Sequence, residues 1–301
     1  MQIENQRVDY PFLSKKKISL CIKREDLVHP HISGNKYRKL KYNLIEAKTN
    51  AFTTLLTFGG AYSNHIAATA YAGKQYGFKT IGVIRGEELS EKWKENPTLQ
   101  LAHEHGMQFK FVSREIYRKK ESSDVIGQLK EEFGPFYLLP EGGTNALAIK
   151  GCEEILVPED VEFDIICCSV GTGGTIAGII NSTHSKQKVL GFSALKGDFL
   201  NEDIRKFVQK ENWTLQTEYH FGGYAKLNTA LIHFINDFKE KTQIPLDSIY
   251  TGKMVYGILD LIKKDYFLSG TKILAIHTGG LQSVGGMNIK LKNRQLPLID
   301  I

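Results

Sequence analysis

The sequence lacks any long apolar run and contains only four cysteines among its 301 residues. No apolar stretch approaches the ~20 residues of a membrane-spanning helix, and the polar start contains no apolar signal-peptide core. We therefore expect a cytoplasmic protein that does not enter a membrane. The cysteines form no CxxC pair or Cys/His cluster, so we expect core thiols and no metal site. They are Cys21, Cys152, Cys167 and Cys168.

The charge balance is mildly positive, with a formal net charge of +6. Basic residues gather in two short clusters, at residues 15–17 and 118–120, and acidic residues lie near both. Nucleic-acid binding needs a contiguous basic surface, which clusters this short do not provide. We therefore expect no nucleic-acid partner, whereas a positive balance would suit small anionic molecules.

Apolar and β-branched stretches alternate with helix-like stretches along the chain. This alternation is typical of βαβ units and predicts an α/β fold with mainly parallel twisted sheets flanked by helices. The stretch 165–170 is apolar almost throughout, as expected for a strand that is buried on both faces. We predict strands at residues 55–58, 80–84, 109–112, 136–139, 165–170, 189–193 and 273–276. We predict helices at residues 64–76, 97–105, 124–133, 145–155, 175–182, 229–241 and 254–264.

Glycine and small polar residues follow four of the predicted strands. These loops come after Phe58, Leu139, Val170 and Ile276. In open α/β sheets, ligands bind beyond the carboxyl ends of the strands, so the four loops should lie at one functional edge. Their concentration at this edge favours an enzyme.

The loop after Val170 has the strongest signal of the four. Its glycines would let backbone N–H groups approach an anion closely, and the start of the following helix adds partial positive charge. The loop therefore predicts a phosphate site, although it lacks the Lys-Ser/Thr pair of a nucleotide-binding P-loop. The alternative is a tight glycine turn without a ligand. The residues are Gly171, Thr172, Gly173, Gly174 and Thr175.

The other three loops offer weaker signals. At residues 59–65, Ser63 could cap a helix while neighbouring N–H groups bind a carboxylate. A plain capped helix start explains this loop equally well, and an isolated His65 is more often structural. In the loop at 141–145, Asn145 could bond a ring substituent or cap the next helix. The loop at 278–280 (TGG) is informative only as the fourth at the same edge.

A lysine at the start of an early helix is the candidate reactive group. Lys36, Leu40 and Leu44 recur at helical spacing and share the apolar face, whereas we expect Lys39 and Lys41 on other faces. Burial disfavours a charged amine, so Lys36 should have a lowered pKa and a neutral amine that can condense with an aldehyde. The alternative is a lysine that extends along the helix to water.

Seven motifs, taken in order, resemble those of one family. They are residues 23–26 (KRED), 34–36 (GNK), 63–65 (SNH), 143–145 (GTN), 171–175 (GTGGT), 250–253 (YTGK) and 277–280 (HTGG). From about residue 22 to residue 280 the chain resembles the 1-aminocyclopropane-1-carboxylate deaminase and D-cysteine desulfhydrase family. These are tryptophan-synthase-β-like (fold type II) pyridoxal-phosphate enzymes. The resemblance implies a smaller domain at residues 50–149, inserted into a larger cofactor-binding domain of residues 1–49 and 150–301.

The resemblance also implies a role for each matching position. Lys36 would hold pyridoxal 5'-phosphate as a Schiff base and then move protons. Ser63, Tyr224 and Tyr250 would act beside the reacting atoms, and a homodimer is usual for such proteins. The cofactor would also contact Asn64, Gly171, Thr172, Gly173, Gly174, Thr175, Thr251 and Thr278. The substrate, a small amino acid, would contact Ser63, Asn64, His65 and Tyr224.

Two threonines favour one branch of the family. Cyclopropane deaminases are similar but carry Glu at the position of Thr251 and Leu at that of Thr278. A carboxylate keeps the pyridine ring protonated and strongly electron-withdrawing, whereas a threonine supports a weaker electron sink that still suffices to expel a thiol. We therefore expect β-elimination from D-cysteine to sulfide, pyruvate and ammonia. The alternatives are a cyclopropane deaminase, a β-replacement synthase of the cysteine-synthase kind and a binding protein without turnover.

Overall fold

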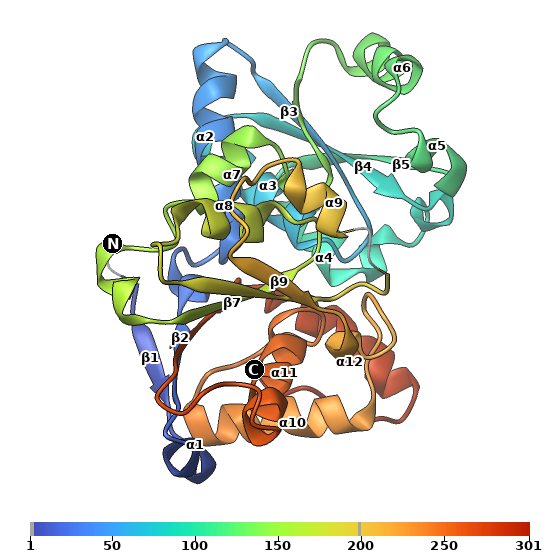
Figure 1. The fold of residues 1–301 in the computed structure, drawn as a ribbon. Coiled ribbons are helices and arrows are strands. Elements are labelled where there is room, and N and C mark those ends of the chain that lie inside the picture. The colour runs from blue at the N-terminus through green and yellow to red at the C-terminus, as the bar shows by residue number, and fades with distance from the viewer. Residues whose placement is uncertain (1–2, 198–199) are drawn as a thin grey trace.

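Two mainly parallel sheets organise the chain, and the computed structural model describes residues 3–197 and 200–301 (Figure 1). The larger sheet has the order β1-β2-β10-β7-β8-β9, in which β1 pairs antiparallel with β2 and the remaining pairs are parallel. The smaller sheet, above it in Figure 1, has the parallel order β5-β4-β3-β6. The α/β fold class predicted from the sequence is confirmed.

The seven predicted strands are present with ends shifted by at most two residues, whereas β1, β2 and β9 were not predicted. These three are four or five residues long, and their mixed polar and apolar residues give no continuous apolar run. The strands are β1 (Asn5–Val8), β2 (Ser19–Lys23), β3 (Thr54–Gly59), β4 (Lys79–Arg85), β5 (Met107–Val112), β6 (Tyr137–Leu139), β7 (Ile165–Val170), β8 (Lys188–Ser193), β9 (Trp213–Gln216) and β10 (Lys272–Ile276).

The predicted helices are also present, and side-chain caps fix several of their starts. Ser63 Oγ accepts from the Ile66 N–H at 3.4 Å, and Asn145 Oδ1 accepts from the Ala148 N–H at 2.9 Å. No helix of the described chain is long and apolar enough to cross a membrane. The helices are α1 (Pro11–Lys16), α2 (Asn35–Thr49), α3 (Asn64–Tyr76), α4 (Pro97–Glu104), α5 (Arg114–Arg118), α6 (Ser123–Phe133), α7 (Ala146–Cys152), α8 (Gly174–Ser182), α9 (Leu200–Arg205), α10 (Thr229–Thr242), α11 (Thr251–Lys263) and α12 (Gln282–Asn293).

The packing of the central strand β7 explains why its sequence is apolar almost throughout. Ile166, Cys168 and Val170 pack on the face covered by α8, while Cys167 packs on the face covered by α10 and α11. Both cysteines are fully buried free thiols, as expected for core residues. A strand buried on both faces holds its carboxyl end rigidly, which is the end from which Gly171 continues.

The strands of the smaller sheet lie between residues 54 and 139, within the range predicted for an inserted domain. Helix α3 follows β3 and packs against the strands of this sheet, while α2 packs against α7 and contacts α3 (Figure 1). The carboxyl ends of both sheets carry the glycine-rich loops predicted to bind a ligand. The division into two domains stays a prediction.

A glycine contact joins the larger sheet to the start of α2. Gly34 has φ +60°, and a methyl carbon added there would lie 2.0 Å from the carbonyl oxygen of Thr278. The same oxygen accepts from the Asn35 N–H at 3.2 Å. Since only glycine combines this left-handed backbone with so close an approach, Gly34 sets the position of α2 relative to β10.

Gly34→Ala should lower the free energy of unfolding by about 3 kcal/mol or more, since a backbone at φ +60° and ψ −138° costs alanine ~1–3 kcal/mol and forcing the Thr278 backbone apart adds ~1–3 kcal/mol. Gly77→Ala is the matched control, because Gly77 has φ +78° and the described chain places no atom within 4 Å of an added methyl. This control should lose only the ~1–2 kcal/mol of backbone strain. Denaturant titrations measure both losses, and equal losses would contradict the close contact.

Candidate functional site

Two lysine ammonium groups meet at one carbonyl oxygen in the candidate site. Lys36 Nζ and Lys39 Nζ each donate to the Gly142 carbonyl oxygen at 3.0 Å. The expectation that Lys39 lies on another face of α2 is wrong: residues three apart are neighbours on a helix, and Lys39 is the more deeply buried of the two, at 2% exposed. Lys41 does lie outside the site, paired with Glu154 at 2.7 Å.

The pKa of Lys36 is lowered well below its ordinary value, first by burial and then by the charge of Lys39. Burial also lowers the pKa of Lys39. Neither ammonium forms an ion pair with a carboxylate within residues 3–197 and 200–301. Two cationic groups without a counter-charge favour loss of one proton and binding of an anion.

The glycine-rich loop after β7 lies next to this pair of lysines. Lys39 Nζ is within 3.4 Å of Thr172 Oγ1 and 2.9 Å of Thr144 Oγ1, and the two threonine oxygens are 2.7 Å apart. Asn35 Nδ2 donates to Thr175 Oγ1 at 2.8 Å, which ties the start of α2 to the start of α8. The structure therefore brings Lys36 and the predicted phosphate loop together.

Backbone geometry at this loop suits an anion. Gly173 has φ +80° and precedes α8, whose start at Gly174 adds the partial positive charge of a helix N-terminus. A methyl carbon added at Gly171 would lie 3.0 Å from the Tyr250 hydroxyl, so glycine is required for the tyrosine to lie over the loop. Hydroxyls, N–H groups and Lys39 together form a cradle for a phosphate.

Ser63 and Asn64 form the opposite wall of the site at the start of α3. Ser63 caps this helix, and Asn64 is its first residue. The buried Oδ1 atom of Asn64 has no hydrogen-bond partner in the part of the chain that the structure describes. The Asn64 amide nitrogen lies 3.1 Å from a methyl carbon placed on Gly280, so the loop after β10 closes on it. A buried amide with an unused oxygen is suited to a polar ligand.

His65, predicted to contact substrate, lies beneath this wall with its ring buried against β3. Thr57 Oγ1 donates its proton to the Leu139 carbonyl oxygen at 2.9 Å, so His65 Nε2, at 2.9 Å from Thr57 Oγ1, must be the donor of that pair. The Nδ1 atom is therefore unprotonated, in the neutral form of the ring. Burial and the charges of Lys36 and Lys39 lower the His65 pKa well below its ordinary value.

Two tyrosines predicted to act beside the reacting atoms, Tyr224 and Tyr250, come together at the mouth of the site. They belong to different segments of the chain. Their ring centroids are 6.2 Å apart at a near-perpendicular angle. Burial, followed by the nearby Tyr224 and Asp247, raises the pKa of Tyr250 well above its ordinary value, and burial raises that of Tyr224. Both phenols therefore stay protonated near neutral pH and can donate hydrogen bonds.

The two threonines that separate the branches of the family lie in different surroundings. Thr278, at the end of β10, has its hydroxyl 3.1 Å from that of Ser169 on β7, which gives a neutral hydroxyl pair. Thr251 is fully buried, and its hydroxyl donates to Asp247 Oδ1 at 2.7 Å and accepts from the Asp247 N–H at 3.0 Å. The structure therefore places Thr251 as an anchor of the loop before α11.

Three residues that the sequence analysis did not select also border the site. Tyr117 donates to Glu141 Oε1 at 2.7 Å, next to the Gly142 carbonyl that accepts from both lysines. The guanidinium of Arg85 lies 5.6 Å from the centre of the Tyr117 ring. No local pattern indicates Arg85 on β4 or Tyr117 on α5, whereas Glu141 begins the loop at 141–145 that the sequence pattern does indicate.

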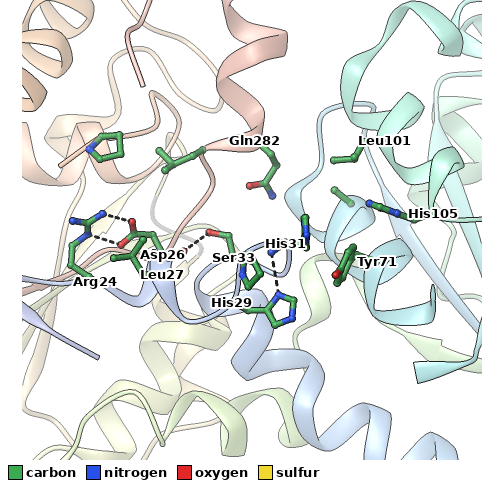
Figure 2. Close-up of a pocket in the computed structure, with 14 residues that line it drawn as sticks. Arg24, Asp26, Leu27, His29, His31, Ser33, Tyr71, Leu101, His105 and Gln282 are labelled. Atoms are coloured by element: carbon green, nitrogen blue, oxygen red, sulfur yellow. Dashed lines mark hydrogen bonds and ion pairs between the residues drawn. The ribbon is translucent and has the colours of Figure 1, made fainter. Parts of the chain in front are cut away.

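A separate cavity of about 610 Å³ is lined in part by His29, His31 and Ser33, from the segment that precedes α2 (Figure 2). His29, His31 and His105 surround Tyr71 there, with His31 stacked on the tyrosine at 4.3 Å between centroids. None of the predicted cofactor or substrate residues lines it. Ser33, which does line it, lies next to Gly279, since a methyl carbon added at Gly279 would be 2.5 Å from Ser33 Oγ.

The residues around Lys36 fit pyridoxal phosphate. The phosphate would meet Lys39, Thr172, Thr175 and the N–H groups of the glycine loop. The aldehyde carbon would meet the Lys36 amine, whose lowered pKa favours the uncharged form, and a polar ring substituent could use the unpartnered amide oxygen of Asn64. The ring nitrogen would meet the hydroxyl of Thr278 rather than a carboxylate.

Comparisons with known proteins agree with this geometry. The family model for "Pyridoxal-phosphate dependent enzyme" matches residues 4–279. A mitochondrial protein of Arabidopsis thaliana named "Bifunctional D-cysteine desulfhydrase/1-aminocyclopropane-1-carboxylate deaminase" is 33% identical, covering 87% of this chain and 72% of that protein. The 1-aminocyclopropane-1-carboxylate deaminase of Cyberlindnera saturnus is 24% identical, over 88% and 86% of the chains. A crystal structure titled as an ACC deaminase homologue has a TM-score of 0.82 at 27% identity, over 97% and 94% of the chains.

Lys39→Gln should weaken binding of the cofactor about tenfold to a hundredfold, because it removes a charge-assisted hydrogen bond to the phosphate worth ~1.5–3 kcal/mol. Lys41→Gln is the control, since Lys41 pairs with Glu154 outside the site. Titration of each cofactor-free variant, followed by visible absorbance, gives the two dissociation constants. If both variants bind equally well, Lys39 does not contact the phosphate.

The free energy of unfolding of the cofactor-free protein should increase with pH because of Lys36. The folded protein releases this proton at a lower pH than the unfolded chain, whose lysine keeps the ordinary pKa of 10.5. The unfolded state therefore holds more protons between the lowered pKa and that value, and stability rises across this window. Lys36→Met should flatten the rise in urea titrations between about pH 7 and about pH 10. An unchanged slope would contradict the lowered pKa.

Proposed function

Because the chain belongs to the family of pyridoxal-phosphate dependent enzymes, we propose that it catalyses β-elimination from a small amino acid, D-cysteine being the best candidate. The products would be sulfide, pyruvate and ammonia. The observation that carries the proposal is the Lys36 amine, which lies beside a phosphate cradle with its pKa lowered well below the ordinary value. The names of the curated relatives support the same chemistry.

When bound, pyridoxal phosphate supplies an aldehyde that condenses with amines and a ring that withdraws electrons from the adjacent carbon. We propose that Lys36 holds it, with Lys39, Thr172 and Thr175 on its phosphate. The glycines Gly171, Gly173 and Gly174 let the backbone approach that phosphate. Asn64 and Thr278 would bond the ring substituents, and Thr251 would act indirectly by holding the loop before α11.

The wall at the start of α3 would bind the substrate carboxylate. Ser63 offers a hydroxyl, and the first N–H groups of α3 offer partial positive charge. His65 would support this wall from beneath, because its Nε2 atom is committed to Thr57. A carboxylate held here leaves the α-carbon of the substrate on the side of the Lys36 amine.

Lys36 would then act as the base that takes the α-proton. A neutral amine accepts a proton, and the lowered pKa of Lys36 favours this neutral form. The protonated phenols of Tyr250 and Tyr224 would donate hydrogen bonds to the departing β-substituent, whose negative charge grows as it leaves.

The neutral surroundings of Thr278 support a desulfhydrase over a cyclopropane deaminase. The pair of Thr278 and Ser169 hydroxyls offers only a hydrogen bond to a ring nitrogen. A ring that is not held protonated is a weaker electron sink, which suffices when the leaving group is a thiolate. As the resemblance implies, we also propose a homodimer with the cofactor between the domains at residues 50–149 and at residues 1–49 with 150–301. We propose a cytoplasmic location from the sequence pattern alone.

Lys36→Ala should abolish release of sulfide and pyruvate from D-cysteine while the protein stays folded, because no other amine of the site lies at the same position. Lys41→Ala, on the outer face of α2, is the control and should keep activity. The measurements are sulfide and pyruvate assays, with circular dichroism to verify the fold. Full activity in Lys36→Ala would refute the role of this lysine.

The same assay separates the alternatives. Formation of 2-oxobutyrate from 1-aminocyclopropane-1-carboxylate at a higher rate would make the protein a cyclopropane deaminase. A strict requirement for a second, nucleophilic substrate would make it a β-replacement synthase. Cofactor binding without turnover of any small amino acid would leave a binding protein.

A further inference from the structure

Lys253 is a fully buried lysine for which the proposed reaction gives no role. Its side chain is 2% exposed, and its ammonium donates to the carbonyl oxygens of His220 at 2.9 Å and Gly223 at 2.8 Å. Both carbonyls belong to the segment that carries Tyr224. A buried ammonium that bonds two backbone oxygens of one loop fixes the conformation of that loop.

The loop around Tyr224 has an unusual backbone. Phe221, Gly222, Gly223 and Ala225 have φ values of +52°, +93°, +110° and +54°, so left-handed residues flank the tyrosine on both sides. The non-glycine members, Phe221 and Ala225, are strained in this region. Such a loop keeps one conformation only when its surroundings hold it.

The loop's own hydrogen bonds do not attach it to the rest of the fold. The Gly223 N–H donates to the His220 carbonyl at 3.0 Å, and the Lys226 N–H donates to the Gly223 carbonyl at 3.1 Å. These are turns within the loop. Each of these two carbonyl oxygens also accepts a hydrogen bond from Lys253. Because Lys253 belongs to α11, which packs in the core of the larger sheet, it connects the loop to that core.

We propose that Lys253 is a positioning residue, which holds Tyr224 against Tyr250 over the candidate site. The inference rests on the proposed function, because it assigns Tyr224 to the reacting side. Tyr250 is the N-cap residue of α11 and Lys253 lies in the first turn of that helix, so the element that places Tyr250 also fixes the loop that places Tyr224. The 6.2 Å separation of the two rings is thus set by a single element.

Packing alone does not explain why Lys253 is buried. Burial lowers its pKa to about 8, which the charge of Asp247 opposes. The neighbouring buried positions of α11, Met254 and Ile258, are apolar. A methionine at position 253 would fill the same space without desolvating a charge, so the ammonium is required by its two carbonyl partners rather than by the core.

A double-mutant cycle tests whether Lys253 acts through Tyr224. Lys253→Met should lower kcat/KM for the elimination about tenfold to a hundredfold, as expected for loss of a buried charge-assisted contact. In a Tyr224→Ala background the same change should cost less than about threefold, because the residue it positions is gone. Lys253→Arg should recover part of the activity, and Lys263→Met, at an exposed site of the same helix, should leave it unchanged. Additive losses in the cycle would overturn the proposal.

Hydrogen exchange gives a readout that does not depend on turnover. In Lys253→Met, amides of residues 221–226 should exchange faster, while those of β7 and β8 should keep the wild-type rate. Wild-type exchange throughout this loop would overturn the proposal even if the enzyme is active. If the wild type releases no sulfide or pyruvate, the proposed function fails, whereas faster exchange confined to this loop still supports the role of Lys253.

Discussion

The structure depends on one electrostatic arrangement, in which two lysine amines share the Gly142 carbonyl oxygen. Burial lowers the pKa values of both, and the charge of Lys39 lowers that of Lys36 further. Two changes would reduce the unfavourable electrostatic energy of this arrangement. One is loss of the charge on Lys36, and the other is an anion bound at Lys39. Lys36 and Lys39 would hold pyridoxal phosphate in a way that provides both, since its aldehyde can condense with an uncharged amine and its phosphate is an anion. The unliganded protein is therefore prepared for this cofactor at the cost of some stability.

Holding two amines at one oxygen requires rigid support from several segments. The buried strands β7 and β10 present the loops that begin at Gly171 and His277, and the contact of Gly34 with Thr278 sets the start of α2 against them. Asn35 then joins α2 to the glycine loop through Thr175. A shift of any of these segments by one ångström would separate the amines from the phosphate cradle, which is the physical reason for so many glycines at this edge.

The sequence predicts the strands of both sheets well where they are buried on two faces, and poorly where they are short. Residues 165–170 form β7 as expected. Strand β2 has only five residues and is polar at both ends, so its sequence contains no long apolar run that would indicate a strand. Among site residues, Lys36 and the loop at 171–175 follow from local pattern. The expected position of Lys39 is wrong because residues three apart on a helix, like residues four apart, lie on the same face. The partners of Lys253 could not be predicted, because His220 and Gly223 come from a distant loop without periodicity.

The carboxylates of Asp247 and Glu141 are engaged by hydrogen bonds of their own, and neither pairs with Lys36 or Lys39 in the described chain. Asp247 accepts hydrogen bonds from Ile249, Tyr250 and Thr251, and Glu141 accepts from Tyr117 and pairs with Lys120. The other groups around Lys36 and Lys39 are amines, hydroxyls and N–H groups, together with two neutral acceptors, the Gly142 carbonyl oxygen and Asn64 Oδ1. Such a field favours bound anions and a neutral Lys36 amine, and it gives no reason for a pyridine ring to hold a proton. The same polarity that attracts the phosphate therefore limits the electron demand of the ring, which matches expulsion of a thiolate better than opening of an unactivated ring.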